Sequence, residues 1–260
     1  MMDFFINLKN WSNGLFPWQK MTKKNMWSDL KPIDFAKIEV VPFPDDQFFK
    51  EECVKKQIVL HHTISGDGVE GDISTWENDP AVVGTCIIID RAGTPWQLFS
   101  SKYWAWHLGV GNKALDSCSI GVELDNWGWL IPGDGTTKQF GNNYDGTPKM
   151  IDTVSGKYYT YYGNSVAVPL QHYPNGFRGY NYYEKYSESQ IRTAGELMLY
   201  WKLRYGIPLG YNEDMWDVSP KALAGSRGIW THASYRPASQ KTDCHPDPSL
   251  IGMLKTLSTI

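Results

Sequence analysis

Three apolar runs along the chain predict buried β-strands. They cover residues 57–63, 85–90 and 117–125, and polar or turn-forming residues separate them. The second run is followed by Arg-Ala-Gly-Thr and then by apolar residues 95–99, which predicts a hairpin with a glycine-containing turn. Residues 66–79 are polar, and we interpret them as a loop with room for one short helix.

A helical pattern follows in the last third of the chain. Ser187-Glu-Ser-Gln190 fits a capping box, in which the two side chains bind free backbone amides at a helix start. Apolar side chains then recur at helical spacing, and these are Ile191, Ala194, Leu197, Met198 and Trp201. Gly206 and Pro208 predict the end of this helix, and residues 249–257 predict a short closing helix. The apolar face is typical of core packing and not of a cofactor site.

The long block at residues 127–185 has a different character. Turn signals such as Asp134-Gly, Asn143-Tyr-Asp-Gly and Pro174-Asn-Gly separate tyrosine-rich runs. This pattern predicts β-hairpins or ordered loops. His172 lies in this block and receives no role from its surroundings.

Composition narrows the classes of function. The 260 residues carry a net charge of −3 and their basic residues are scattered, so we expect no nucleic-acid partner and no binding to anionic membranes. No run of 18 apolar residues is present, so we expect no membrane insertion. The amino-terminal residues lack the basic start and apolar stretch of a secretory signal, which predicts synthesis in the cytoplasm.

The four cysteines form no closely spaced pair. We therefore expect free thiols, as in a reducing compartment, at Cys53, Cys86, Cys118 and Cys244. Cys86 and Cys118 stand in apolar runs, which predicts that both belong to the core.

Residues 228–246 contain several side chains that can bind a metal ion or take part in catalysis. This stretch contains His232, Lys241, Asp243 and Cys244, and its Ser, Pro and Gln residues argue against a helix or a long strand. A catalytic zinc needs three protein ligands and one open position, and two histidines with one carboxylate also describe certain iron sites. His232 and Asp243 are two candidate ligands, and the third would come from the histidine pair that ends the strand at residues 57–63.

One carboxylate stands inside an otherwise apolar strand. Glu123 lies in Ser119-Ile-Gly-Val-Glu-Leu, and a carboxylate in such a strand is costly unless it is paired or functional. It is therefore either a salt-bridged core residue or a catalytic group.

Four motifs occur in a characteristic order. They are Ile58-Val-Leu-His61-His-Thr63, Ala105-Trp-His107-Leu-Gly-Val110, Ser119-Ile-Gly-Val-Glu-Leu124 and Lys241-Thr-Asp243. Together they resemble the zinc-dependent N-acetylmuramoyl-L-alanine amidase family, which includes phage lysozyme-type enzymes, anhydro-muropeptide amidases and peptidoglycan-recognition proteins. The resemblance covers roughly residues 57–126 and 187–255. It implies an α/β fold with a central mixed β-sheet flanked by helices.

The resemblance also implies roles for single residues. His61, His232 and Asp243 would bind Zn²⁺, Glu123 would act as the base, and Lys241 would stabilise the oxyanion. Cys244 remains an alternative ligand, because relatives use either residue type. His107 and Trp106 would line the substrate cleft, although His107 also fits a buried core position. Many relatives carry a catalytic tyrosine where this chain has Thr85, which cannot supply a phenol.

The expected organisation is an amino-terminal arm at residues 1–55 and an amidase domain at residues 56–260 with an insertion at about 127–185 beside the cleft. The arm carries Trp11, Phe16, Trp18 and Trp27, which are too many aromatic residues for a disordered tail. We interpret it as packed on the main domain; a wall-binding or partner-binding segment is the alternative.

The implied function is hydrolysis of the amide between N-acetylmuramic acid and L-alanine in peptidoglycan or muropeptides. The expected setting is that of a phage endolysin, which is released from the cytoplasm to the cell wall. The alternatives are a cytosolic recycling enzyme, a non-catalytic peptidoglycan receptor and a zinc peptidase that cuts within the stem peptide.

Overall fold

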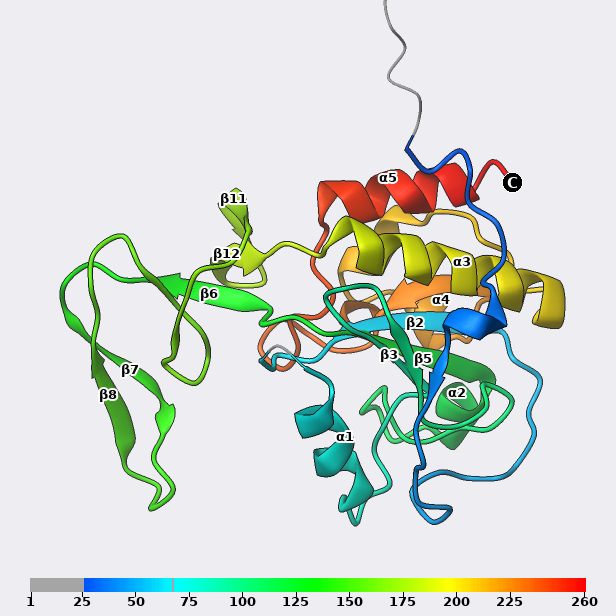
Figure 1. The fold of residues 1–260 in the computed structure, drawn as a ribbon, viewed down its shortest axis with the longest axis horizontal. Helices are drawn as coiled ribbons and strands as arrows, with labels where there is room; N and C mark the ends of the chain where they lie inside the picture. Colours follow the sequence, from blue (N-terminus) through cyan, green and yellow to red (C-terminus); the bar gives the residue numbers. More distant parts are fainter. Residues whose placement is uncertain (1–25, 67) are drawn as a thin grey trace, which may run out of the picture.

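A mixed six-stranded sheet forms the centre of the molecule (Figure 1). The computed structural model describes residues 26–66 and 68–260. In spatial order the strands are β1 (Glu39–Val40), β4 (Pro95–Gln97), β3 (Ile87–Ile89), β5 (Ser119–Leu124), β2 (Gln57–His62) and β13 (Gly228–Thr231). The last four run parallel, and β4 is antiparallel to β3. The predicted α/β fold with a mixed central sheet is confirmed.

Helices cover the sheet on both sides. α3 (Glu188–Tyr205) and α5 (Pro248–Leu257) lie together along one side, and α1 (Glu70–Glu77) lies on the opposite side (Figure 1). α3 begins with the predicted capping box: Ser187 Oγ accepts from the Gln190 amide, and the Gln190 side chain accepts from the Ser187 amide. Gly206 ends α3 in the left-handed conformation, as glycine does most easily.

Four shorter helical segments complete the core region. They are η1 (Phe35–Lys37), α2 (Lys113–Cys118), η2 (Glu213–Trp216) and α4 (Pro220–Leu223). A further 3-10 turn, η3 (His232–Ser234), follows directly after β13. None of the helices in the described ranges is both long and apolar enough to cross a membrane.

A second, antiparallel sheet projects from one end of the molecule (Figure 1). We call residues 127–185 the outer lobe. Its sheet contains β10 (Ser165–Val166), β9 (Tyr158–Tyr159), β6 (Trp129–Pro132), β12 (Tyr180–Glu184) and β11 (Leu170–Phe177), in that spatial order. A separate hairpin joins β7 (Thr137–Asn142) to β8 (Pro148–Asp152). Of the three turn signals in this block, Asn143-Tyr-Asp-Gly closes the β7–β8 hairpin. Asp134-Gly lies between β6 and β7, which do not pair with each other, and Pro174-Asn-Gly lies within β11.

The residues before β1 lie against α3. Trp27 and Ile33 are buried in the core cluster, and Ile33 donates its backbone amide to Glu196 O. Gly195 permits this close packing, because a Cβ there would lie 3.0 Å from Met253 Sδ and 3.1 Å from Leu30 Cδ1. The expectations for Trp11, Phe16 and Trp18 concern positions outside the described residues.

Some local predictions need correction. The strand expected from residue 117 begins at Ser119, because Asn112 caps α2 and residues 113–118 turn as a helix. All four cysteines are free, as expected, but only Cys86 and Cys244 are buried. Cys118 is half-buried, because it lies at the end of α2, so the prediction that it is a core residue was wrong.

Candidate active site

Three donor side chains meet at the carboxyl end of two neighbouring strands. His61 lies at the end of β2, and His232 follows β13, which pairs in parallel with β2 through Thr231 and Leu60. The loop after η3 folds back because Ala233 donates its amide to Asp243 O at 2.7 Å. Parallel register thus brings residues far apart in sequence to one edge of the sheet, where α/β proteins commonly bind ligands.

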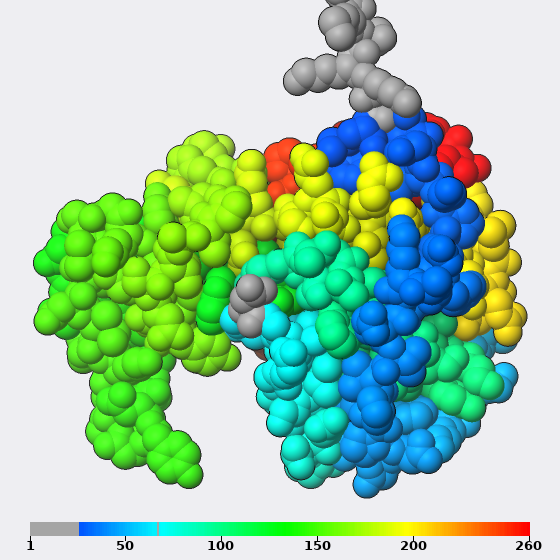
Figure 2. Space-filling view, viewed as in Figure 1, coloured from blue at the N-terminus to red at the C-terminus, as the bar shows by residue number. Residues whose placement is uncertain are grey.

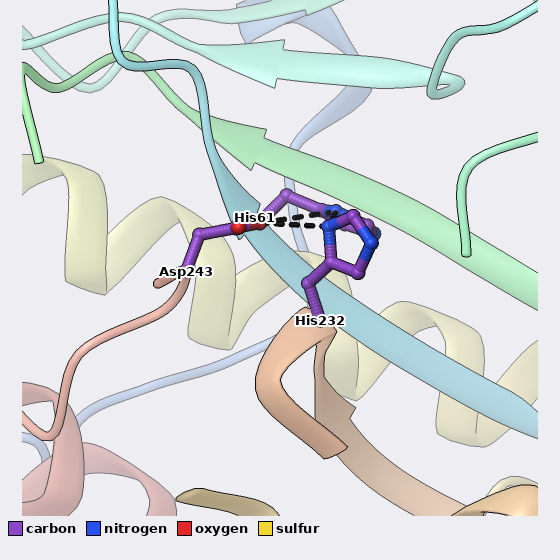
Figure 3. Close-up of side chains that lie close together, drawn as sticks. All are labelled: His61, His232 and Asp243. Atoms are coloured by element: carbon purple, nitrogen blue, oxygen red, sulfur yellow. Dashed lines mark hydrogen bonds and ion pairs between the residues drawn. The ribbon is translucent and has the colours of Figure 1, made fainter. Parts of the chain in front are cut away.

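The three side chains point towards one another (Figure 3). Nδ1 of His61 lies 2.9 Å from Nδ1 of His232 and 3.4 Å from Oδ2 of Asp243. Oδ2 of Asp243 also lies 2.9 Å from Nδ1 of His232. All three are buried, and their donor atoms lie within 4.8 Å of one another, as the ligands of a single metal ion would.

Hydrogen bonds on the far side of each ring fix which nitrogen carries a proton. His232 Nε2 lies 3.1 Å from Leu108 O, which can only accept, so Nε2 is the donor and Nδ1 is the nitrogen that faces the other two side chains. Ser119 Oγ donates its one proton to Asp116 O, and therefore accepts from His107 Nε2 at 2.7 Å. His107 Nδ1 is then free to accept from His61 Nε2 at 3.0 Å.

This chain of bonds turns Nδ1 of both histidines towards the Asp243 carboxylate. Three electron-donating atoms at this spacing suit a cation placed between them. Metal-binding histidines commonly donate their second nitrogen to a protein acceptor in this way. The donor set therefore fits a divalent metal ion.

Gly121 explains how His107 reaches this position. A Cβ at Gly121 would lie 2.7 Å from Thr85 Cγ2 and 3.1 Å from His107 Nδ1, so the ring occupies space that any side chain would fill. Asp116 Oδ1 accepts from the backbone amides of His107 and Leu108, which fixes the segment. The sequence motifs at residues 105–110 and 119–124 thus form one structural unit.

Burial controls the protonation of these groups. It lowers the pKa of His61 to about 4, with a further contribution from the charge of His232, so His61 is neutral at pH 7. Burial alone would raise the pKa of Asp243, but His232 and His61 outweigh it and hold that pKa well below its usual range. A neutral imidazole and a carboxylate are the forms that bind metal.

A cavity of about 270 Å³ opens in front of the three donors. Glu123 and Lys241 both line it, as do Asp72 and Trp76 of α1 and Tyr162 of the outer lobe. Glu123 pairs in register with His61 across β5 and β2. Its Oε2 has no hydrogen-bond partner among the described residues, and burial, followed by the charges of Asp243 and Asp72, raises its pKa well above its usual range.

Glu123 is therefore not a salt-bridged core residue. In the described structure no cation pairs with it, and its carboxyl group lines the cavity beside the donor cluster. A buried carboxyl group with a raised pKa is suited to accept and return a proton near neutral pH.

Of the two residues expected to line the substrate cleft, the structure places one at the cavity. His107 lines the cavity, but Trp106 does not, because its ring packs edge-on against Trp104 at 5.3 Å. Thr85 lines the cavity, with its hydroxyl donated to Ile87 O. His62 points to the other side of β2, where Nδ1 lies 2.8 Å from the Tyr186 hydroxyl.

Two residues of the cavity carried no usable sequence signal. Asp72 lies in a polar stretch and Tyr162 in a block with many tyrosines, so neither stands out by pattern. Asp72 Oδ2 accepts from Ser65 at 2.8 Å, and burial raises the pKa of Asp72 to about 6. Only the packing of α1 and the outer lobe brings these two side chains to the cavity.

Comparison with known proteins places the chain in a family. The family described as N-acetylmuramoyl-L-alanine amidase matches residues 54–248, so the chain belongs to that family. It is thus an enzyme that hydrolyses the amide bond between N-acetylmuramic acid and L-alanine in peptidoglycan. No curated protein matches the sequence.

The solved structures that match this chain have distant sequences. PlyL is 14% identical, with a TM-score of 0.42 over 76% of this chain and 82% of that chain. The hydrolase AmiA of Staphylococcus aureus is 12% identical, with a TM-score of 0.46 over 88% of this chain and 85% of that chain. The endolysin LysCS of Clostridium intestinale is 13% identical, with a TM-score of 0.40 over 82% and 88%.

Proposed function

We propose that the enzyme is a zinc-dependent amidase in which His61, His232 and Asp243 bind the metal, Glu123 transfers the proton and Lys241 stabilises the oxyanion. The observation that carries the proposal is that all five side chains line one cavity at the carboxyl ends of β2, β5 and β13. Two imidazoles and one carboxylate leave a fourth position open, which is the pattern of catalytic zinc.

Bound zinc would polarise the scissile carbonyl group and lower the pKa of a coordinated water molecule. Glu123 accepts the proton of the attacking water and later delivers it to the leaving amine of L-alanine. Its burial supports this role, because a raised pKa lets one carboxyl group act first as base and then as acid. Lys241 lines the same cavity, and its ammonium group would stabilise the developing negative charge on the carbonyl oxygen.

We further propose that the enzyme acts on the polymeric cell wall, as an endolysin does. A hollow lies between α1 and the outer lobe (Figure 2), and the catalytic cavity is lined from both sides of it by Asp72 and Tyr162. An open approach of this kind suits a long substrate that cannot enter an enclosed pocket.

Digestion of purified peptidoglycan tests the proposed function. We expect mass spectrometry to find stem peptides with new free L-alanine amino termini and glycan chains that remain intact. New termini within the stem peptide would instead identify a peptidase, and binding without turnover would identify a receptor.

Metal analysis tests the cofactor. We expect about one zinc per chain, loss of activity with a chelator and recovery with added zinc. Active protein with a zinc content near zero would contradict the assignment.

A further inference from the structure

A second cavity of about 520 Å³ adjoins the catalytic one. It lies between the outer lobe and the loop at residues 238–242, and four residues line both cavities: Thr63, Ile64, Tyr162 and Lys241. The two cavities are therefore immediate neighbours. The volume of the second cavity is in the range of pockets that enclose a small organic ligand.

One wall of this second cavity is aromatic and comes from the outer lobe. Trp129 stacks on Tyr180 with ring centroids 3.9 Å apart and planes 9° apart, and Tyr161 meets Trp129 edge-on at 5.7 Å. Tyr161 and Tyr162 are nevertheless 44% and 49% exposed. Exposed neighbouring aromatic rings on a cleft are a common sign of a binding surface.

The two exposed tyrosines are held in place by the β7–β8 hairpin. Their turn is closed by the Gly163 amide, which donates to Thr160 O at 2.9 Å, and Lys149 Nζ donates to Tyr162 O at 2.6 Å. Gly163 has a φ of +78°, and a Cβ there would lie 3.0 Å from Ile151 Cγ1. The rings are therefore presented by a fixed turn, which lowers the entropy cost of binding.

The opposite wall is polar and is also fixed. It consists of Ser239, Gln240, Lys241 and Thr242 with Ala238. Arg178, in the turn between β11 and β12, donates hydrogen bonds of 2.8 Å to the backbone carbonyls of Arg236 and Lys241. Because Arg178 belongs to the outer lobe, it sets the spacing between the two walls.

The charges that line the two cavities suggest which half of the substrate, the stem peptide or the glycan, each cavity would bind. Among its described lining residues the second cavity has no carboxylate and one cation, Lys241, whereas Asp72, Glu123 and Asp243 line the catalytic cavity. The stem peptide carries ionised groups, whereas N-acetylated sugars are uncharged and offer C–H faces, hydroxyl groups and amides. Flat rings opposite hydroxyl and amide groups match the sugar half.

We propose that the second cavity is a saccharide subsite that binds the N-acetylated amino sugars next to the muramoyl residue being cleaved. This inference rests on the proposed function, because it takes the catalytic cavity as the place where the muramoyl amide lies. Aromatic stacking on Tyr161 and Tyr162 supplies affinity for the glycan chain. The enzyme consequently prefers substrates whose glycan extends beyond one sugar.

Binding of an uncleavable glycan tests the subsite separately from catalysis. Calorimetry of the full-length protein with a tetramer of N-acetylglucosamine, which has no peptide, should detect binding. Tyr161→Ala should weaken the affinity for the tetramer by about 3- to 10-fold, which is the contribution of one aromatic contact. Tyr161→Phe should retain the affinity of the parent protein. Tyr144→Ala is the matched control, because Tyr144 is fully exposed in the β7–β8 turn and lines neither cavity.

Kinetics supply the second readout. Tyr161→Ala should raise the KM of amidase substrates that carry several sugars and leave the KM of a muramoyl peptide with a single sugar unchanged. Absence of tetramer binding to the parent protein, or an equal effect on both substrates, would overturn the subsite. A dependence of the Tyr161→Ala effect on peptide length would instead assign the cavity to the stem peptide. If the parent cleaves neither substrate but binds the tetramer, the proposed function fails and the subsite stands.

Discussion

The guanidinium group of Arg178 donates a hydrogen bond of 2.8 Å to the backbone carbonyl of Lys241. The same group also bonds the carbonyls of Arg236 and Ala233, and its side chain is only 4% exposed. One side chain of the outer lobe thus holds the loop that carries Lys241 and Asp243.

Removal of the Arg178 side chain should impair both the stability of the protein and catalysis. Arg178→Ala leaves three carbonyl groups without their donor, so we expect a loss of about 1–3 kcal/mol in the free energy of unfolding. We also expect kcat/KM to fall by roughly 10- to 100-fold, the usual effect of losing a group that supports catalytic ligands. Denaturant titration and steady-state kinetics measure the two effects.

Arg204→Ala is the matched control for this prediction, because Arg204 is exposed on α3 and its guanidinium group lies over the Tyr205 ring. Arg178→Lys should recover little, since one ammonium group cannot reproduce the planar fork of donors. Wild-type kinetics in Arg178→Ala would show that the loop holds its shape unaided.

Two adjacent residues offer a test of ligand identity. Asp243 Oδ2 lies 2.9 Å from His232 Nδ1, whereas Cys244 is wholly buried and burial raises the pKa of its thiol well above the usual range. We therefore expect Asp243→Ala to lose zinc and activity and Cys244→Ser to keep both. Metal content measured by mass spectrometry distinguishes the two ligands. Zinc retained in Asp243→Ala and lost in Cys244→Ser would identify Cys244 as the ligand.

His107 should affect the metal without touching it. It accepts from His61 Nε2 and so keeps the Nδ1 lone pair of His61 directed at the other donors. His107→Ala should weaken zinc binding by roughly 10- to 100-fold in competition with a chromogenic chelator. His172→Ala should have no effect, because His172 is exposed and stacks on Tyr182 in the outer lobe. Equal zinc affinity in both variants would show that His107 does not support metal binding.

Glu123→Gln separates binding from chemistry. Glutamine keeps the shape of the side chain but cannot accept a proton, so turnover should fall by roughly 10²- to 10⁴-fold. Zinc content and peptidoglycan binding should remain. Unfolding of this variant would make Glu123 a structural residue, and hydrolysis at the parent rate would place the base elsewhere.

The raised pKa of Glu123 also predicts how stability depends on pH in metal-free protein. The folded state holds the Glu123 proton more tightly than the unfolded chain, so the parent loses stability as pH rises from the ordinary carboxyl range towards the raised pKa. Glu123→Gln should therefore be more stable than the parent at pH 7. The difference should vanish below about pH 4, where both states are protonated. Denaturant titrations in the presence of a chelator at the two pH values measure it.

Sequence patterns predicted the elements with strong local signals. The capping box at Ser187 and the apolar stripe after it identify α3, and the apolar run ending at His61 identifies β2. The short strand β13 was harder to foresee, because four residues acquire their extended form by pairing with β2. Similarly, α2 depends on the Asn112 cap, since its six residues have no clear apolar face.

The site could be predicted only in part, because some of its residues are brought together by contacts that are distant in the sequence. Motif order singled out His61, Glu123, His232, Lys241 and Asp243, and the structure brings all five to one cavity. Trp106 was expected beside His107, but consecutive residues can point in different directions, and its ring packs on Trp104. Asp72 and Tyr162 reach the cavity, and Arg178 reaches the backbone of Lys241, through long-range packing, which no local pattern encodes.

The outer lobe leaves and rejoins the central region at one place. Glu184 donates its backbone amide to Gly128 O at 2.9 Å, and β6 pairs with β12 just beyond. In evolutionary terms, a segment with adjoining ends can be lengthened, shortened or exchanged without rethreading the rest of the chain. The wall of the second cavity that the outer lobe supplies can therefore change while the residues at the ends of β2, β5 and β13 keep their places, provided that each new segment retains a donor that does what Arg178 does here.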